Sequence, residues 1–260
     1  MSDPTFETIL YEQDGPVVTL TMNRPDRRNA MSNRMVREVG DALAHAAEDR
    51  SVRVLVLTGA GTSFCPGADL QAVASGTADA PLEPADFRAP VLLHEMPAVT
   101  IAAINGACAG AALGWACACD LRLAARSARF NTAFLDVGVA GDMGGPWTLP
   151  RLLGAAKARE LYFLPAKFDA DEALRIGLVS QVVDDEAFPA AVGALVERLA
   201  AAAPAGLRTM KQNFSDAERM DLAAFVDLES ERHLRLFRLH DTREAFLAKV
   251  EKRSPRFEGR

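Results

Sequence analysis

The sequence predicts an α/β core followed by a region made only of helices. As far as about residue 185, apolar runs rich in β-branched residues alternate with amphipathic stretches, which is the pattern of strands that alternate with helices. After that point, amphipathic segments follow one another without a strand between them. Because 260 residues can bury a large core, we expect one principal domain with a helical appendage.

The core elements are expected from turn, capping and apolar signals. A hairpin opens the chain, since Gln13-Asp14-Gly15 separates two apolar runs, and Ser32 can cap the helix that follows. Unbroken apolar runs such as Val52–Leu57 predict strands buried on both faces. The expected strands are 8–11, 17–22, 52–57, 99–104, 121–124 and 179–183, and the expected helices are 32–49, 110–118, 146–163 and 169–176. Residues 71–90 are rich in Ala, Pro and Gly, which predicts a mobile flap over a site.

The C-terminal region is expected to hold four helices. These helices are 186–202, 205–214, 217–239 and 241–252. We place the domain boundary near residue 200, so that residues 1–199 form the core and residues 200–260 form the appendage. Such a helical end either packs back on the core or builds an oligomer interface, and we favour the interface.

Charge and cysteine content argue against several classes of protein. The net charge of -6 gives no general basic field for nucleic acid, so any anionic ligand must be held by local groups. The four cysteines are too clustered for a disulfide framework, and Cys117 and Cys119 lack the spacing of a zinc or redox site. We therefore expect no metal and a reducing, cytoplasmic environment. Asn105-Gly106 interrupts the uncharged run Ala98–Cys119, which favours a buried segment over a membrane span.

Two segments could present backbone N–H groups to an anion. In FCPGADL, Phe64–Leu70, Gly67 lets the chain turn sharply and expose the N–H of Ala68. In INGACAGAALGWACACD, Ile104–Asp120, a helix begins at Gly110-Ala111-Ala112, where the first N–H groups have no intrahelical partner. Taken singly, an ordinary glycine turn and a helix of small residues packed on a sheet would explain the same segments.

Together and in this order, these segments resemble the two oxyanion-hole signatures of the crotonase (enoyl-CoA hydratase/isomerase) family. The resemblance extends to Pro25–Met31, Ala170–Val183 and Lys252–Pro255, which are similar to the family's Asn-Ala loop, its helix-to-strand passage and its C-terminal tail. It implies a spiral of ββα turns with a C-terminal helical trimerisation region. It also implies that the N–H groups of Ala68 and Ala111 form the oxyanion hole.

The same resemblance implies an acyl-CoA substrate, with coenzyme A present as part of the thioester and no separate cofactor. It implies a homotrimer or hexamer, and we expect no nucleic-acid or membrane partner. The residues expected to bind the substrate are Arg28, Gly67, Asp69, Leu70, Gly110, Phe134 and, from a neighbouring subunit, Lys252. For Asp69 we favour a structural hydrogen-bonding role beside the oxyanion hole.

The reaction depends on which carboxylates are present. In hydratases of this family two glutamates flank the double bond, and their positions correspond here to Gly114 and Phe134, neither of which can move a proton. Asp142, in the loop Gly138–Trp147, resembles in position the aspartate of isomerase-type members, including the phenylacetate-pathway ring-opening isomerases. The leading hypothesis is therefore an acyl-CoA isomerase that converts 3-enoyl to 2-enoyl thioesters through an enolate, with Asp142 as acid and base.

Other hypotheses remain open from the residues. Enoyl-CoA hydration could persist, or Asp142 could act as the nucleophile of an aryl-CoA dehalogenase, although those enzymes pair it with a tryptophan where this chain has Phe134. A hypothesis of another class is a non-catalytic acyl-CoA-binding protein that keeps the thioester cradle. The plain structural alternative is that Asp142 belongs to a glycine-rich turn without chemistry.

Overall fold

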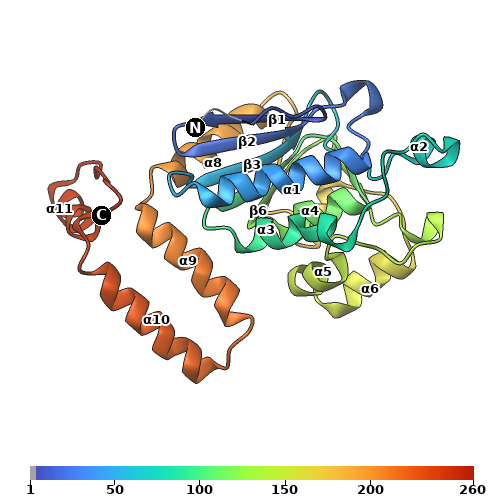
Figure 1. Ribbon diagram of the computed structural model, residues 1–260. Helices are drawn as coiled ribbons and strands as arrows, with labels where there is room; N and C mark the ends of the chain where they lie inside the picture. Colours follow the sequence, from blue (N-terminus) through green and yellow to red (C-terminus); the bar gives the residue numbers. More distant parts are fainter. Residues whose placement is uncertain (1–3) are drawn as a thin grey trace.

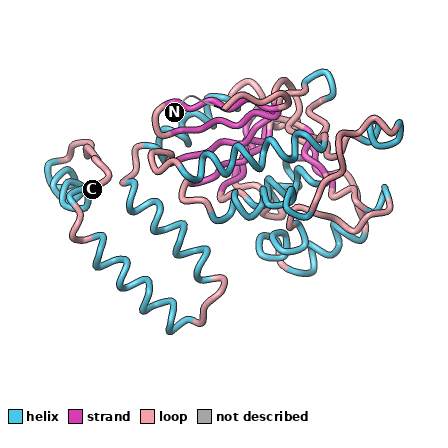
Figure 2. The backbone as a smooth tube through the Cα atoms, viewed as in Figure 1, coloured by secondary structure: helices cyan, strands magenta, loops and turns pink. Residues whose placement is uncertain are grey.

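The protein is built on two sheets with helices packed around them. The strands are β1 (Ile9–Asp14), β2 (Val17–Met22), β3 (Val54–Gly59), β4 (Val99–Ile104), β5 (Ala107–Ala109), β6 (Leu121–Ala125), β7 (Arg129–Asn131), β8 (Phe168–Asp169) and β9 (Gln181–Val183). In the computed structural model, which describes residues 4–260, the larger sheet has the order β1-β2-β3-β4-β6-β9 and the smaller has the order β5-β7-β8. Figure 2 shows the strands gathered in one layer of the molecule with helices on either side.

Helices connect and flank the strands (Figure 1). The α-helices are α1 (Asn33–Glu48), α2 (Leu70–Ser75), α3 (Ala89–Glu95), α4 (Ala111–Ala118), α5 (Gly145–Leu153), α6 (Ala155–Phe163), α7 (Ala170–Arg175), α8 (Phe188–Ala200), α9 (Pro204–Ala217), α10 (Leu222–Leu236) and α11 (His240–Glu251). Short 3-10 helices are η1 (Pro25–Arg27), η2 (Pro84–Arg88) and η3 (Leu135–Val137).

The first elements form as the sequence predicts. β1 and β2 pair antiparallel, whereas the other neighbours in the larger sheet run parallel. The hydroxyl of Ser32 accepts a hydrogen bond from the Met35 N–H at 3.1 Å and so caps α1. The helix predicted at 146–163 is divided into α5 and α6 by Gly154, whose φ of +80° suits glycine and breaks the helical path.

The central strands of the larger sheet, β3 and β4, are buried on both faces, which explains their unbroken apolar runs. Successive side chains of a strand point to opposite faces. Val54 and Val56 of β3 therefore pack in one apolar cluster with Phe188 of α8. Leu55 and Leu57 belong instead to the main core, to which α1, α3 and α4 contribute on the other face.

Some elements were not predicted from the sequence. β5, β7 and β8 have three residues or fewer, which is too short for a periodic pattern to be recognised. Residues 71–90, predicted as a flap without clear pattern, contain most of α2, then η2, and join the start of α3. Side chains of α1 hold this segment, because Asn33 donates to the Asp79 carbonyl at 3.1 Å and Arg37 donates to the Pro81 carbonyl at 2.6 Å.

The last three helices, α9, α10 and α11, extend away from the sheets, and α9 connects them to the core (Figure 1). The ammonium group of Lys211 in α9 lies 2.8 Å from the Asp120 carboxylate and donates to the carbonyls of Leu93 and Ala98 at 2.9 and 2.8 Å. Because Lys211 is buried and Asp120 only partly exposed, breaking this pair would leave a buried ammonium group unpaired, which is costly. The domain boundary near residue 200 stays a prediction.

Two observations bear on the expected location of the protein. Within residues 4–260, no single helix is long and apolar enough to span a membrane; the pair Phe188–Ala200 and Pro204–Ala217, bent by 102°, reaches that length and composition only together. The four cysteines are buried thiols that form no disulfide. A cytoplasmic location stays a prediction.

Candidate active site

Two parallel backbone segments place the predicted oxyanion donors in register. Cys65 pairs with Cys108 in parallel, and the Ala109 N–H donates to the Cys65 carbonyl at 3.1 Å. Ala68 follows Cys65 by the same number of residues as Ala111 follows Cys108. The two donors therefore lie on neighbouring segments, although about forty residues separate them in the chain.

Gly67 and Gly110 allow these segments to approach closely. Their φ angles are +97° and +55°, a backbone conformation that side-chain-bearing residues rarely adopt. A methyl group on Gly67 would lie 3.1 Å from the Ala109 carbonyl oxygen and 3.7 Å from the Gly110 Cα. Within residues 4–260, no protein group accepts a hydrogen bond from the N–H of Ala68 or Ala111. Two such donors, one of them at the start of α4, can bind an oxyanion.

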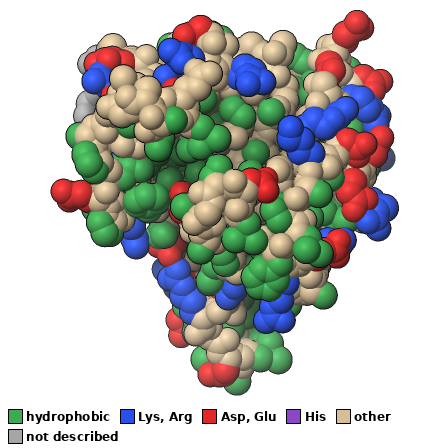
Figure 3. Space-filling model, turned by 90° about the vertical axis from the view of Figure 1, so that its right-hand side faces the viewer, with side chains coloured by type: hydrophobic (Ala, Val, Ile, Leu, Met, Phe, Trp, Pro, Cys, Tyr) green, Lys and Arg blue, Asp and Glu red, His purple; other side chains and the backbone are tan. Residues whose placement is uncertain are grey.

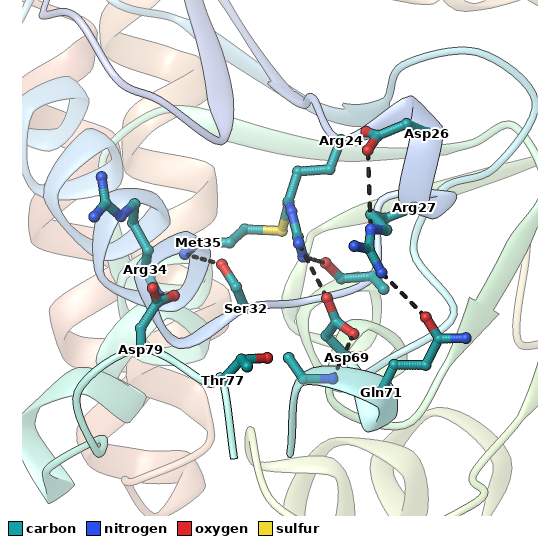
Figure 4. Close-up of polar contacts among 12 residues, drawn as sticks. Arg24, Asp26, Arg27, Ser32, Arg34, Met35, Asp69, Gln71, Thr77 and Asp79 are labelled. Carbon is teal, nitrogen blue, oxygen red and sulfur yellow. Dashed lines mark hydrogen bonds and ion pairs between the residues drawn. The ribbon is translucent and has the colours of Figure 1, made fainter. Parts of the chain in front are cut away.

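Contacts to the loop after β2 fix the position of the segment that carries Ala68, and Figure 4 shows one of them, between Arg24 and Asp69. The Met31 N–H donates to the Gly67 carbonyl at 2.8 Å, and the Asp69 N–H donates to the Met31 carbonyl at 2.9 Å. The Arg24 guanidinium lies 3.0 Å from the buried Asp69 carboxylate, which also caps α2. These contacts engage Asp69 within the protein, as in the structural role favoured for it from the sequence; its contact with substrate stays a prediction.

Asn29 supports the same loop and was not singled out as a site residue from the sequence. Its buried side chain donates to the carbonyls of Ala60 and Ser63 at 2.9 and 2.7 Å and accepts from the Arg24 N–H at 2.9 Å. It thereby ties the loop after β2 to the loop after β3, which carries Ala68. The motif Pro25–Met31 contains this asparagine, but a sequence match does not show which groups it joins.

Asp142 lies between η3 and α5 in a loop of unusual backbone conformation. Gly141, Met143 and Gly144 have φ angles of +106°, +50° and +71°. Burial raises the pKa of the Asp142 carboxyl above its usual range. Its Oδ1 atom is buried and, among the described residues, has no hydrogen-bond partner. A carboxyl group in these surroundings takes up a proton more readily than one in water, which suits acid–base chemistry.

The loop that carries Asp142 rests on the helix that begins with Ala111. A methyl group on Gly114, about one helical turn after Ala111, would lie 2.6 Å from the Met143 Cβ and 2.7 Å from the Met143 carbonyl oxygen. Met143 itself is buried. The structure therefore brings the Asp142 loop within one helical turn of Ala111, a predicted oxyanion donor, and leaves no space for a side chain at position 114.

Replacing Gly114 by alanine should destabilise the protein, because the added methyl group would overpack the contact with Met143. We expect a loss of about 1–3 kcal/mol in the free energy of unfolding. A matched control is Gly40→Ala in α1, where no atom lies within 4 Å of the added group and a gain of about 0.5–1 kcal/mol is expected. Denaturant unfolding of both variants measures the difference, and equal stabilities would contradict the close contact.

An aromatic pair lies beside the Asp142 loop. The rings of Phe134 and Tyr162 stack with their centroids 6.0 Å apart and their planes 4° from parallel. Exposed apolar side chains follow on α2 and around η3, namely Leu70, Val73, Leu135, Val137 and Val139. Figure 3 shows hydrophobic side chains around a hollow on the face of the molecule formed by these elements. Such an apolar mouth suits the acyl part of a ligand.

Comparison with known proteins identifies the family. Residues 12–260 match the family model described as enoyl-CoA hydratase/isomerase. The chain belongs to the enoyl-CoA hydratase/isomerase family. It is 37% identical over 261 residues to 1,2-epoxyphenylacetyl-CoA isomerase of Escherichia coli (strain K12), an alignment that covers 98% of this chain and 100% of that protein. It is 31% identical to crotonyl-CoA hydratase of Syntrophomonas wolfei, with 97% and 98% of the two chains covered.

A solved structure of the family has the same fold. The crystal structure of enoyl-CoA hydratase from Bacillus anthracis superimposes with a TM-score of 0.89 at 29% identity, covering 98% of this chain and 100% of that one. The crotonase fold expected from the sequence, with its C-terminal helices, is thereby confirmed. The family contains both isomerases and hydratases among these relatives, so membership alone does not choose between the two reactions.

The remaining residues predicted to bind substrate lie in different parts of the family fold. Leu70 is exposed as the first residue of α2, next to Asp69. Arg28 is exposed in the loop after η1, with a φ of +53°. Lys252 follows α11, at the opposite end of the molecule from α2 in Figure 1. Within one chain the structure does not bring Lys252 to the oxyanion hole, and its predicted contact requires a neighbouring subunit.

Proposed function

We propose that this protein is an acyl-CoA isomerase that converts 3-enoyl thioesters into 2-enoyl thioesters or performs a closely related double-bond shift. The observation that carries the proposal is the partly buried Asp142 carboxyl, whose Oδ1 has no partner among the described residues and whose loop packs one helical turn from Ala111. The similarity to 1,2-epoxyphenylacetyl-CoA isomerase supports an isomerase.

The proposed reaction needs one carboxylate and two N–H donors. The N–H groups of Ala68 and Ala111 donate to the thioester oxygen and stabilise the negative charge that develops there. Asp142 takes a proton from the α-carbon, and the electron pair of that C–H bond forms the dienolate. The same carboxyl group then returns the proton to the γ-carbon, which moves the double bond from the β,γ to the α,β position. These steps balance without an electron acceptor, with coenzyme A present only in the substrate.

Hydration is the weaker candidate on the local geometry. It requires one group that activates water and a second that delivers a proton to the α-carbon. The two family positions that would carry glutamates are Gly114, where Met143 fills the space, and the apolar Phe134. The similarity to crotonyl-CoA hydratase supports hydration as the alternative reaction.

A panel of 2-enoyl-, 3-enoyl- and aryl-CoA thioesters, analysed by liquid chromatography with mass spectrometry, tests the proposal. We expect a 3-enoyl-CoA to change its retention time without a change of mass. Gain of one water would identify a hydratase, and loss of halide from a halogenated aryl-CoA would identify a dehalogenase. Binding of every thioester without any product would identify a non-catalytic acyl-CoA-binding protein.

We also propose that the protein assembles as a homotrimer or hexamer through its C-terminal helices. The helices carry a set of exposed apolar side chains, namely Met210, Phe214, Leu222, Leu234, Phe237, Phe246 and Val250. A groove of about 660 Å³ lies along α9 and α10 and is lined by several residues of both helices. Exposed apolar area of this extent is typical of a surface that another protein chain covers.

Sedimentation velocity at micromolar concentration should show a trimer or hexamer. Phe214→Glu places a charge in the apolar set on α9 and should shift the protein towards monomers. Leu10→Glu, on the exposed side of β1, serves as the control and should leave the assembly unchanged. A monomeric parent protein would contradict the proposed assembly.

A further inference from the structure

We infer that Tyr162 is a positioning residue for Asp142, because its ring and hydroxyl hold the loop Gly141–Gly145 in the conformation that presents the carboxyl group. The inference rests on the proposed function, since it assigns a supporting role in the same reaction. Tyr162 belongs to α6, outside the sequence motifs that resemble the family. Its role follows from the contacts that the fold creates between α6 and the loop before α5.

Tyr162 contacts the loop on both sides of Asp142. A methyl group on Gly141 would lie 3.0 Å from the Tyr162 Cε1 atom and 3.4 Å from the Phe134 Cδ2 atom. A methyl group on Gly145 would lie 1.8 Å from the Tyr162 hydroxyl oxygen. At both positions the tyrosine occupies the space that a side chain would need. Positions 141 and 145 can therefore approach Tyr162 this closely only as glycines.

The conformation between these two contacts requires support from its surroundings. Met143 adopts a φ of +50°, a left-handed conformation that is unfavourable for a residue with a side chain. Such a conformation persists when neighbouring structure enforces it. Helix α4 packs against the loop at Gly114, and Tyr162, stacked on Phe134, packs against Gly141 and Gly145. The loop is thus held between two helices, with Asp142 in its middle.

The electrostatic influence of Asp142 on the Tyr162 hydroxyl supports the closeness of these two side chains. Burial, and then the nearby ionisable groups Cys117 of α4 and Asp142, raise the pKa of the Tyr162 hydroxyl. The pKa of Asp142 is raised by burial, to which a neighbouring aromatic ring contributes by excluding water. Removing the ring of Tyr162 should therefore change the proton affinity of Asp142 as well as its position.

A double-mutant cycle between Gly145 and Tyr162 tests the inference. Gly145→Ala should collide with the Tyr162 hydroxyl, displace the loop and lower kcat for 3-enoyl-CoA isomerisation about 10–100-fold, with KM within about threefold of the parent. Tyr162→Phe removes the colliding oxygen, and the nearest ring atom is then Cζ at 3.1 Å from the added methyl group. The double variant should regain most of the lost kcat and most of the lost Tm, whereas Tyr162→Phe alone should cost only a few-fold in kcat.

Tyr162→Ala provides a readout that a purely structural role would not move. Admitting water beside Asp142 should lower its pKa, so the acid limb of the kcat profile should shift to lower pH. The chain's other tyrosine provides the control: Tyr11→Phe alters β1, where the ring packs against His45, and should leave kcat and the pH profile unchanged.

The outcomes separate this inference from the proposed function. If Gly145→Ala lowers kcat and Tm equally with and without the Tyr162 hydroxyl, Tyr162 does not position the loop and the inference is wrong. If the parent protein isomerises no thioester, the proposed function fails. In that case the Tm values of the parent, the two single variants and the double variant still decide whether Tyr162 shapes the Asp142 loop. If the effects of Gly145→Ala and Tyr162→Phe on Tm simply add, the inference is wrong whatever the reaction is.

Discussion

Replacing Asp142 by asparagine should lower isomerisation of a 3-enoyl-CoA by about 10²–10⁴-fold, while the affinity for the thioester stays close to that of the parent protein. Asparagine keeps the shape of the side chain but cannot take up the α-proton. The Ala68 and Ala111 N–H groups belong to the backbone, so the variant still has the donors proposed to bind the thioester oxygen. Steady-state kinetics give the loss of rate, and calorimetric titration with a non-reactive acyl-CoA gives the affinity.

A thermal melt distinguishes this catalytic role from a turn-stabilising role for Asp142. Because burial raises the pKa of Asp142, its contribution favours folding at acid pH, below the pKa of the unfolded chain, and is lost as the pH rises through the folded-state pKa. Asparagine does not ionise. The Tm of Asp142→Asn should therefore equal or exceed that of the parent at neutral pH. A lower Tm with the parent rate would show that Asp142 stabilises the turn, and a normally melting variant that isomerises at the parent rate would show that Asp142 is not the base.

Ala68→Pro should lower the rate by about 10²–10³-fold, because proline removes one of the two proposed oxyanion donors. Among the described residues, no protein group is hydrogen-bonded to the Ala68 N–H, so its removal breaks no internal hydrogen bond. The loss should therefore appear in turnover more than in stability. Ala68→Ser retains the N–H and should remain within a few-fold of the parent rate.

Kinetics and circular dichroism of the two variants decide the assignment of this donor. Ala68→Pro should fold. A proline restricts the backbone of the residue before it, and Gly67 tolerates that restriction better than any other residue would. Equal losses of activity in folded Ala68→Pro and Ala68→Ser would mean that the side chain, and not the N–H, matters at position 68. The oxyanion hole would then lie elsewhere.

Local signals account for the parts of the fold that the sequence predicted. The hairpin depends on a turn between two apolar runs, α1 depends on the Ser32 cap, and β3 and β4 depend on unbroken apolar runs. Each signal lies within a few neighbouring residues. The strands β5, β7 and β8 carry no such signal because their pairing partners, and not their own pattern, make them strands.

The candidate site also has parts that local signals predict and parts that depend on contacts between distant segments. The glycines at 67 and 110 and the segments around them predicted the proposed oxyanion hole, because a sharp turn and a helix start are local features. The contacts that support the site join distant segments: Asn29 holds carbonyls of the loop after β3, Met143 fills the space at Gly114, and α6 supplies Tyr162 to the Asp142 loop. No spacing within the chain indicates such contacts.

By itself the sequence therefore determined the family of the protein, the order of most of its elements and the two turns that expose backbone donors. Each of these follows from residue types that act on their immediate neighbours. Only the tertiary structure decided that Ala68 and Ala111 lie in register, that position 114 has no room for a side chain and that Tyr162 packs on both sides of Asp142. These features depend on close packing between segments far apart in the chain, where a difference of one methyl group decides what fits.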